Sequence, residues 1–280
     1  MKRDMADRFL KPRSTMFRFR SPGLFYRWQI IRQTLSFLNR LRKDREVRRY
    51  AGRSLDEYQA YDDFEQRIYE RGSTYTYNHG KMKLTSFKDV RDYALAPVIK
   101  EINTLIAEGN AKPRVLEAGC GNCINLMLLH KEFGEHIELV GIDITSQRLK
   151  VAQTYWGDKL GSAKIMVDSV LELKSAEDSS FDLVFSVHCL EQLPYDVDQA
   201  VKMMKRVSRN RIVFVEPVWE NHNISQKLYT LYADHVRTLW PAVLSNDLKV
   251  IDTYAAELMA NPLNRSGIIV AQKTVPDAAR

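Results

Sequence analysis

The residues best placed to do chemistry lie in a glycine-rich segment that follows an apolar run. The segment reads Glu117-Ala118-Gly119-Cys120-Gly121-Asn122-Cys123. Glycines let the backbone turn tightly and approach a ligand, and the exposed N–H groups at a helix start favour a negative group. We therefore predict that a buried strand ends in a ligand-binding turn and that a helix opens at about Asn122. A bare Gly-x-Gly pattern is weak evidence, since many loops contain one.

Acidic residues follow the next two apolar runs and strengthen this prediction. Asp143, in Gly141-Ile142-Asp143, comes 24 residues after Gly119, and Asp168-Ser169 follows the third run. A carboxylate at the end of the second strand is placed to accept hydrogen bonds from ribose hydroxyls. Asp168 and Ser169 would then lie where an adenine binds. The pattern predicts a nucleoside pocket at the carboxyl ends of parallel strands.

Two other nucleotide-binding patterns are missing from the sequence. A dinucleotide fingerprint needs glycine at position 124, where this chain has Ile124. The chain also has no Gly-x-x-x-x-Gly-Lys-Ser/Thr segment, so a phosphate-binding loop of that type is excluded. A nicotinamide-dependent oxidoreductase is therefore disfavoured.

The elements that must position these residues follow a regular alternation from Lys112 onward. We predict strands at 114–118, 137–144, 163–167, 181–187, 211–215, 248–254 and 267–271, and helices at about 123–133, 146–160, 196–208 and 223–240. Such alternation indicates an α/β fold with a mostly parallel sheet. Because residues 255–265 are too few for a helical crossover, the last two strands should pair antiparallel in a seven-stranded sheet.

Upstream of this domain, two further regions differ in pattern. Residues 1–53 form a basic arm in which 21–43 reads as an amphipathic helix, and 54–110 reads as a helical or lid region. Within the second region, Gly72 to Gly80 reads as a polar, aromatic loop. Ser86 and Asp89 are spaced as a helix-capping pair before a helix that ends near Gly109. We thus predict an N-terminal helical extension and a third domain at 111–280.

The charge of the chain is concentrated in the arm. Residues 1–53 hold 16 basic and 4 acidic residues, a net charge of +12, whereas the whole chain carries +7. This asymmetry suggests a polyanionic partner, such as an anionic membrane surface bound through residues 21–43, or, less favoured, nucleic acid. Docking of the apolar stripe on the protein's own core or on a second copy is the leading alternative, and the oligomeric state stays open.

Composition excludes several protein classes. No apolar run approaches the roughly 18 residues that span a bilayer, and the start lacks the apolar core of a secretory signal. Three cysteines fit reduced thiols in a cytosolic compartment. Cys120 and Cys123 lie inside the glycine turn, so we interpret them as small packing residues and expect no metal site. We expect a cytoplasmic protein, with peripheral attachment to a membrane as an option.

The combined motifs resemble those of class I S-adenosylmethionine-dependent methyltransferases, in particular small-molecule members of the type 11 kind. The matching pieces are Glu117 to Gly121, Gly141 to Asp143, Asp168-Ser169, and Phe181 to Pro194. They cover about residues 112–274. The resemblance implies a Rossmann-like, doubly wound sheet whose seventh strand is antiparallel. It also implies S-adenosylmethionine as cofactor.

Carried over by position, the resemblance implies a set of cofactor contacts. Glu117 would approach the methionine amino group, Asp143 the ribose hydroxyls and Asp168 the adenine amine. The implied cofactor-binding residues are Glu117, Gly119, Gly121, Asp143, Ile144, Asp168, Ser169 and Val187. The chain departs from the family at two positions: Cys123 replaces the third glycine of the first motif, and Gln192 replaces a histidine that many small-molecule members carry.

Methyl transfer to a hydroxyl needs a base, whereas transfer to a neutral amine or thiol can proceed without one. His188, after the fourth strand, is the best base candidate, and a residue that only lines the pocket wall is the slightly favoured alternative. Glu191 and Glu216 point to the same rim. His222 and His235 could face substrate or solvent. We expect an oxygen acceptor on a small molecule, glycan or lipid-linked precursor. The alternatives are an RNA methyltransferase that uses the arm, and a catalytically silent scaffold.

Overall fold

The computed structural model describes residues 73–78 and 81–274. The predicted basic arm, its helix at 21–43 and the start of the second region lie outside the described residues. Expectations for those segments therefore remain predictions. The chain divides into two units, residues 1–91 and 92–280, and each is considered by itself.

The described part of the first unit is a β-hairpin followed by a capped helix start. Strands β1 (Ser73–Asn78) and β2 (Lys81–Ser86) pair antiparallel. The prediction of a loop from Gly72 to Gly80 is therefore wrong for 73–78, where alternating Thr and Tyr favour a strand once a partner strand is available.

The helix after the hairpin begins as its capping pair predicts. The backbone N–H of Asp89 donates to Ser86 Oγ at 3.0 Å, and the N–H of Ser86 donates to Asp89 Oδ2 at 3.4 Å. Helix α4 then runs from Phe87 to Ala107. Gly109 follows with a φ of 98°, a left-handed conformation that suits glycine after a helix end.

The second unit contains the predicted seven-stranded sheet. Its strands are β3 Arg114–Ala118, β4 Glu138–Asp143, β5 Lys164–Val167, β6 Phe181–Val187, β7 Ser208–Pro217, β8 Leu248–Ala255 and β9 Ser266–Lys273. Their order is β5-β4-β3-β6-β7-β9-β8. Strand β9 runs antiparallel to both β7 and β8, and the other neighbours are parallel. The topology confirms the predicted antiparallel last strand.

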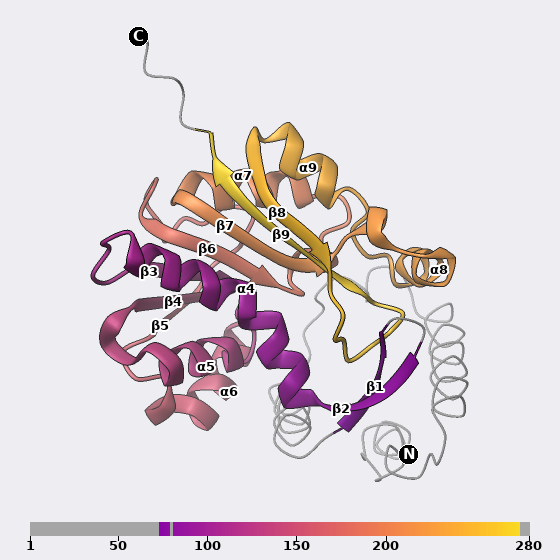
Figure 1. Ribbon diagram of the computed structural model, residues 1–280. Helices are drawn as coiled ribbons and strands as arrows, with labels where there is room; N and C mark the ends of the chain where they lie inside the picture. The colour runs from indigo at the N-terminus through magenta and orange to yellow at the C-terminus, as the bar shows by residue number, and fades with distance from the viewer. Residues whose placement is uncertain (1–72, 79–80, 275–280) are drawn as a thin grey trace, which may run out of the picture. The chain divides into compact units, whose positions relative to one another are not determined.

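Helices cover both faces of this sheet (Figure 1). They are α5 Ile124–Phe133, α6 Ser146–Trp156, α7 Val197–Val207, α8 Ile224–Ala233 and α9 Leu239–Ser245. One core joins α7 and α9 to the sheet through residues such as Met204, Val243, Val184 and Phe214, all essentially inaccessible to solvent. This apolar layer stabilises the sheet and leaves its carboxyl edge for the polar residues of the motifs.

The single helix predicted at 223–240 is wrong, because two helices occupy this span. Asp234 adopts a φ of 52° and ends α8, and α9 begins only after Thr238. The amphipathic pattern continues through the break, so periodicity did not reveal it. The break brings the following residues back toward the sheet, where the N–H of Val236 donates to the carbonyl oxygen of Glu191 at 3.0 Å.

Among the described residues, no helix combines the length and apolar character that crossing a bilayer requires.

Candidate active site

The glycine turn after β3 packs directly against the turn after β6. Gly119 and Gly121 both have positive φ values, 78° and 53°, which glycine adopts without steric cost. A Cβ placed on Gly119 would lie 2.1 Å from Cys189 Sγ. The backbone N–H of Gly119 donates to the carbonyl oxygen of Ile142 at 2.9 Å. The turn therefore joins the ends of β3, β4 and β6 in one place.

Cys123 stands where the related family has its third glycine, and it keeps the glycine-like conformation. It caps α5 with a φ of 59°, which costs a residue with a Cβ about 1 kcal/mol. Its sulfur lies 3.6 Å from that of Cys120, and both side chains are buried. The contact with Cys123 and burial raise the pKa of the Cys120 thiol well above its usual value. Neither cysteine forms a disulfide, and both pack as small buried side chains, as predicted.

Asp143, the predicted ribose-binding residue, is hydrogen-bonded to the glycine turn. Its Oδ2 accepts a hydrogen bond from the N–H of Gly121 at 3.0 Å, and its Oδ1 accepts from the N–H of Thr145 at 2.8 Å. A carboxylate offers about four acceptor positions, so roughly two remain for a ligand. Glu117 is buried in β3, where its Oε1 accepts from Asn125 Nδ2 at 2.6 Å.

Asp168 caps the loop after β5. Its carboxylate accepts from the N–H of Ser169 at 2.7 Å and from both the N–H and the hydroxyl of Ser175, at 2.7 and 2.5 Å. Burial alone would raise the pKa of Asp168, but these hydrogen bonds hold it below its usual value. The carboxylate is therefore charged and oriented, and these contacts all come from the loop after β5.

Two apolar side chains stand exposed beside the acidic pair. Ile144 is 57% exposed and Val167 is 59% exposed, at the ends of β4 and β5. These strands are neighbours, with Asp143 paired to Val167. Apolar surface next to carboxylates suits a flat ring with polar edges.

His188 is held at both ring nitrogens. Its Nδ1 lies 2.9 Å from Glu191 Oε2, and its Nε2 lies 2.8 Å from the hydroxyl oxygen of Ser266. The neutral tautomer satisfies both contacts, because Nδ1–H donates to Glu191 while Nε2 accepts from Ser266. The ring is 37% exposed. Its backbone φ of 52° is left-handed, a strain that surrounding contacts must maintain.

Glu216, at the end of β7, shapes the turn that carries His188. Its side chain is fully buried and accepts hydrogen bonds from the N–H groups of Cys189, Leu190 and Glu191, at 2.9, 3.0 and 3.2 Å. Burial raises the pKa of Glu216 to about 7. For Glu191, burial would also raise the pKa, but the neighbouring imidazoles of His188 and His235 lower it to about 2. Glu191 is thus the charged member of the pair.

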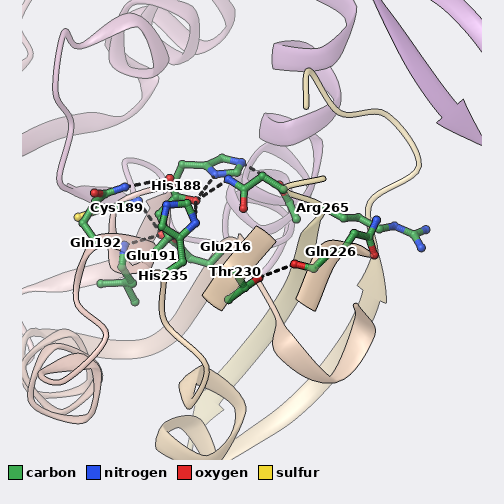
Figure 2. Close-up of polar contacts among 12 residues, drawn as sticks. His188, Cys189, Glu191, Gln192, Glu216, Gln226, Thr230, His235 and Arg265 are labelled. Carbon is green, nitrogen blue, oxygen red and sulfur yellow. Dashed lines mark hydrogen bonds and ion pairs between the residues drawn. The ribbon is translucent and has the colours of Figure 1, made fainter. Parts of the chain in front are cut away.

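Both later histidines are buried, so neither faces solvent. His222 contacts Thr230 Oγ1 through Nδ1 at 3.0 Å and the carbonyl oxygen of Arg265 through Nε2 at 2.8 Å. Burial lowers the pKa of His222. His235 lies close to Glu191, with its Nδ1 3.9 Å from Oε2. Figure 2 shows His188, Glu191, Glu216 and His235 gathered at one site.

Two residues of this cluster escaped the sequence analysis. Ser266 contacts His188, and Asn264 donates to Glu191 Oε2 through Nδ2 at 2.9 Å. They lie more than 70 residues further along the chain and carry no motif. Only the antiparallel pairing of β9 with β7, which sets Ser266 opposite Pro217, brings them to the site.

The structure therefore brings the predicted residues together in two groups. The turn after β3 joins Asp143 and the end of β6, and His188 and Glu191 form a hydrogen-bonded pair beside it. Among the described residues, no group of three histidine, cysteine or acidic side chains could hold a metal ion.

Comparisons with known proteins agree with this geometry. Residues 115–211 match the family described as "Methyltransferase domain". Over 160 residues, the chain is 27% identical to ajmaline N-methyltransferase from Rauvolfia serpentina, with 53% of this chain and 54% of that protein covered. Over 149 residues, it is 29% identical to carboxy-S-adenosyl-L-methionine synthase from Helicobacter pylori, with 51% and 59% covered. The chain thus spans little more than half the length of these relatives.

Solved structures of low sequence identity share the fold. A magnesium protoporphyrin IX methyltransferase from Synechocystis PCC 6803 with bound SAH superimposes with a TM-score of 0.53, at 17% identity, covering 78% of this chain and 97% of that one. A sarcosine dimethylglycine methyltransferase described from Galdieria sulphuraria gives 0.53 at 14% identity, covering 76% and 98%. These likenesses show that the chain shares the Rossmann-like fold of these proteins.

Proposed function

We propose that this chain, which belongs to the class I S-adenosylmethionine-dependent methyltransferases, transfers a methyl group from S-adenosylmethionine to a hydroxyl of a small molecule. The match of residues 115–211 to a methyltransferase domain and the strand order of the sheet support this family assignment. The activity and the acceptor are the proposal. The observation that carries it is the hydrogen-bonded pair of His188 and Glu191 beside the glycine turn.

The residues present fit the cofactor. Asp143 keeps acceptor positions for ribose hydroxyls, and Ile144 and Val167 supply exposed apolar surface for the adenine ring. Gly119 leaves no room for a side chain. Glu117 would hold the methionine amino group, and Gly121 and Val187 would line the pocket for the methionine part. Asp168 and Ser169 would lie at the edge of the adenine ring. When bound, S-adenosylmethionine supplies a methyl group on a sulfonium, which is a good leaving group.

The chain itself must align the acceptor and take its proton. His188 Nε2 is the acceptor atom of a neutral ring, and Glu191 holds the opposite nitrogen. In this mechanism the Ser266 hydroxyl rotates away from Nε2, and the hydroxyl of the acceptor takes its place as the hydrogen-bond donor to Nε2. The proton then moves to Nε2, and Glu191 stabilises the charged imidazole. Because the ring is partly exposed, the proton can afterwards pass to solvent.

Titration calorimetry with S-adenosylmethionine, S-adenosylhomocysteine and NADH tests the cofactor assignment. We expect binding of the first two compounds and none of NADH. A chain that binds none of the three would fit the scaffold alternative. Salt-sensitive binding of RNA, together with methylation of it, would favour the RNA alternative instead.

Alanine at position 119 should lower the free energy of unfolding by about 1–3 kcal/mol, the usual cost of overpacking, and should weaken cofactor binding because the turn has to move. The new Cβ would collide with the side chain of Cys189, and φ is unfavourable for alanine. Calorimetry with S-adenosylhomocysteine measures the loss of affinity. Gly157→Ala is the matched control, because its Cβ would meet only Gln153 Nε2 at 3.5 Å. Equal affinity of the two variants would contradict the role of the turn.

Asp143→Ala should weaken binding of S-adenosylhomocysteine by ~1–3 kcal/mol, the scale of leaving buried polar groups without a partner. The variant removes the ribose acceptor and also frees the N–H groups of Gly121 and Thr145. Comparison with adenine-containing ligands that lack the 2′- and 3′-hydroxyls separates the two effects. Unchanged affinity for S-adenosylhomocysteine in a folded variant would rule out the ribose assignment.

A further inference from the structure

The loop between β8 and β9 places an amide beside the hydrogen-bonded pair of His188 and Glu191. Asn264 donates through Nδ2 to Glu191 Oε2 at 2.9 Å, and the same oxygen lies 2.9 Å from His188 Nδ1. Two residues after Asn264, the hydroxyl oxygen of Ser266 lies 2.8 Å from His188 Nε2. The chain from 264 to 266 therefore contacts both members of the pair, and the proposed mechanism uses only Ser266.

The charge of Glu191 fixes which end of the Asn264 amide faces it. Burial would raise the pKa of Glu191, but the imidazoles of His188 and His235 hold it at about 2. A charged carboxylate accepts hydrogen bonds and donates none. The NH₂ group of Asn264 must then face Glu191, which leaves the amide oxygen, Oδ1, for another partner. Asn264 Oδ1 is consequently a hydrogen-bond acceptor of defined orientation.

This oxygen has no donor within the part of the chain that the structure describes. Asn264 Oδ1 is buried, and no described residue forms a hydrogen bond with it. A buried polar atom without a partner costs about 1–3 kcal/mol, and native proteins keep few such atoms without a reason. Gln192 differs in this respect: its Nε2 donates to Glu191 Oε1 at 3.1 Å, but its side chain is exposed, so water can reach its amide oxygen.

The loop that carries Asn264 is held in place by its own hydrogen bonds and by α8. The backbone N–H of Asn264 donates to the carbonyl oxygen of Asn261 at 3.0 Å. From α8, Gln226 donates through Nε2 to the carbonyl oxygen of Pro262 at 3.0 Å. A rotation of the Asn264 side chain that gave Oδ1 a partner inside the protein would break its hydrogen bond to Glu191. The missing donor is therefore expected from a bound molecule.

We propose that Asn264 is a specificity-determining residue, which selects methyl acceptors that carry a second hydrogen-bond donor near the hydroxyl to be methylated. One hydroxyl takes the place of Ser266 at His188 Nε2, and the second donates to Asn264 Oδ1. The favoured substrates are then polyhydroxylated molecules, such as catechols and sugars. A lone hydroxyl, or one beside a methyl ether, leaves Oδ1 unpaired and reacts less well. This inference rests on the proposed function, because it concerns the acceptor of that reaction.

The test is methyl transfer by the full chain from labelled S-adenosylmethionine to two pairs of probes. The pairs are catechol with 2-methoxyphenol, and resorcinol with 3-methoxyphenol. In each pair, the second compound has a methyl ether in place of one hydroxyl and so lacks the second donor. We expect kcat/KM for at least one diol to exceed that for its ether by about 10- to 100-fold, as expected when a buried acceptor loses its partner.

The preference should disappear in Asn264→Leu, because leucine has about the size of asparagine and no polar atom. This variant also removes a hydrogen bond to Glu191, so Gln192→Leu is the matched control: it removes a hydrogen bond to the same carboxylate without touching Asn264. Gln192→Leu should change the rates of a diol and its ether by the same factor and keep the preference. A preference that survives in Asn264→Leu would overturn the proposal.

The comparison within the unmodified chain needs no variant, and Asn264→Ala, which adds no bulk, replaces Asn264→Leu if the leucine variant does not fold. Equal kcat/KM for each diol and its ether would overturn the inference and leave the proposed function intact. If the chain binds S-adenosylhomocysteine but methylates none of the four probes, the inference is overturned, because two of them present the donor that it requires. Transfer to amines but to no hydroxyl would overturn the proposed function as well.

Discussion

Replacing His188 with asparagine should slow methyl transfer to a hydroxyl acceptor by about 10²- to 10⁴-fold, the usual contribution of a positioned base. Asparagine tolerates the left-handed backbone that His188 adopts, so the turn should persist. The Glu191 carboxylate would then have no ring to orient toward an acceptor. Transfer from labelled S-adenosylmethionine to a panel of small hydroxyl and amine compounds, followed by product mass spectrometry, measures the effect.

Two comparisons make this result specific to base catalysis. Affinity for S-adenosylhomocysteine should be unchanged in His188→Asn, and transfer to amine acceptors should fall much less than transfer to hydroxyls, because a neutral amine needs no base. His136→Asn, at an exposed position in the turn after α5, is the control variant. If the variant methylates hydroxyls as fast as the unmodified chain, His188 is a wall residue and the acceptor class must be reconsidered.

The second large effect concerns stability, through an ion pair at the opposite end of the sheet. Arg211 in β7 contacts Glu101 on α4 and also Oε1 of Glu108, the residue just after α4, at 2.5 Å. The side chains of Arg211 and Glu101 are 7% and 6% exposed. Arg211→Leu would leave the Glu101 charge buried without its partner, so we expect a loss of about 3–5 kcal/mol in the free energy of unfolding.

Urea denaturation measures this loss, and two further variants define its origin. Arg211→Leu combined with Glu101→Leu should recover most of the stability, since a buried ion pair and an apolar pair of similar size are often equivalent. Lys100→Ala removes an exposed pair with Asp252, 3.7 Å apart, and should cost less than about 1 kcal/mol. A loss in Arg211→Leu as small as that in Lys100→Ala would mean that the pair does not stabilise α4 against β7.

The glycine turn and the acidic residues at the strand ends could be predicted from the sequence because they belong to local units. A strand, a turn and a helix start occupy consecutive positions, so the residue type and spacing of Gly119 and Gly121 are enough to predict the turn. Asp143 and Asp168 end neighbouring strands, and parallel strands bring their carboxyl ends to one edge. The antiparallel last strand could also be predicted, because residues 255–265 are too few for the helical crossover that a parallel strand would need.

Other parts could not be predicted, because they depend on contacts between distant segments. The hairpin at 73–86 needed a partner strand to convert alternating Thr and Tyr into a sheet. The helix break at Asp234 interrupts a pattern whose periodicity continues, since a left-handed residue leaves no signal in hydrophobic spacing. Both errors arose where pairing or a single backbone angle overrode local preference.

The sequence alone determined the fold family and the order of the motifs, and it offered His188 as the best base candidate, because each follows from short-range patterns of glycine, acid and apolar residues. Only the tertiary structure decided what surrounds that histidine. Ser266, Asn264 and His235 reach it through strand pairing and a helix break, and they bring a hydroxyl, an amide and a second imidazole around one carboxylate. Their chemistry depends on distance and burial, which residue spacing does not encode.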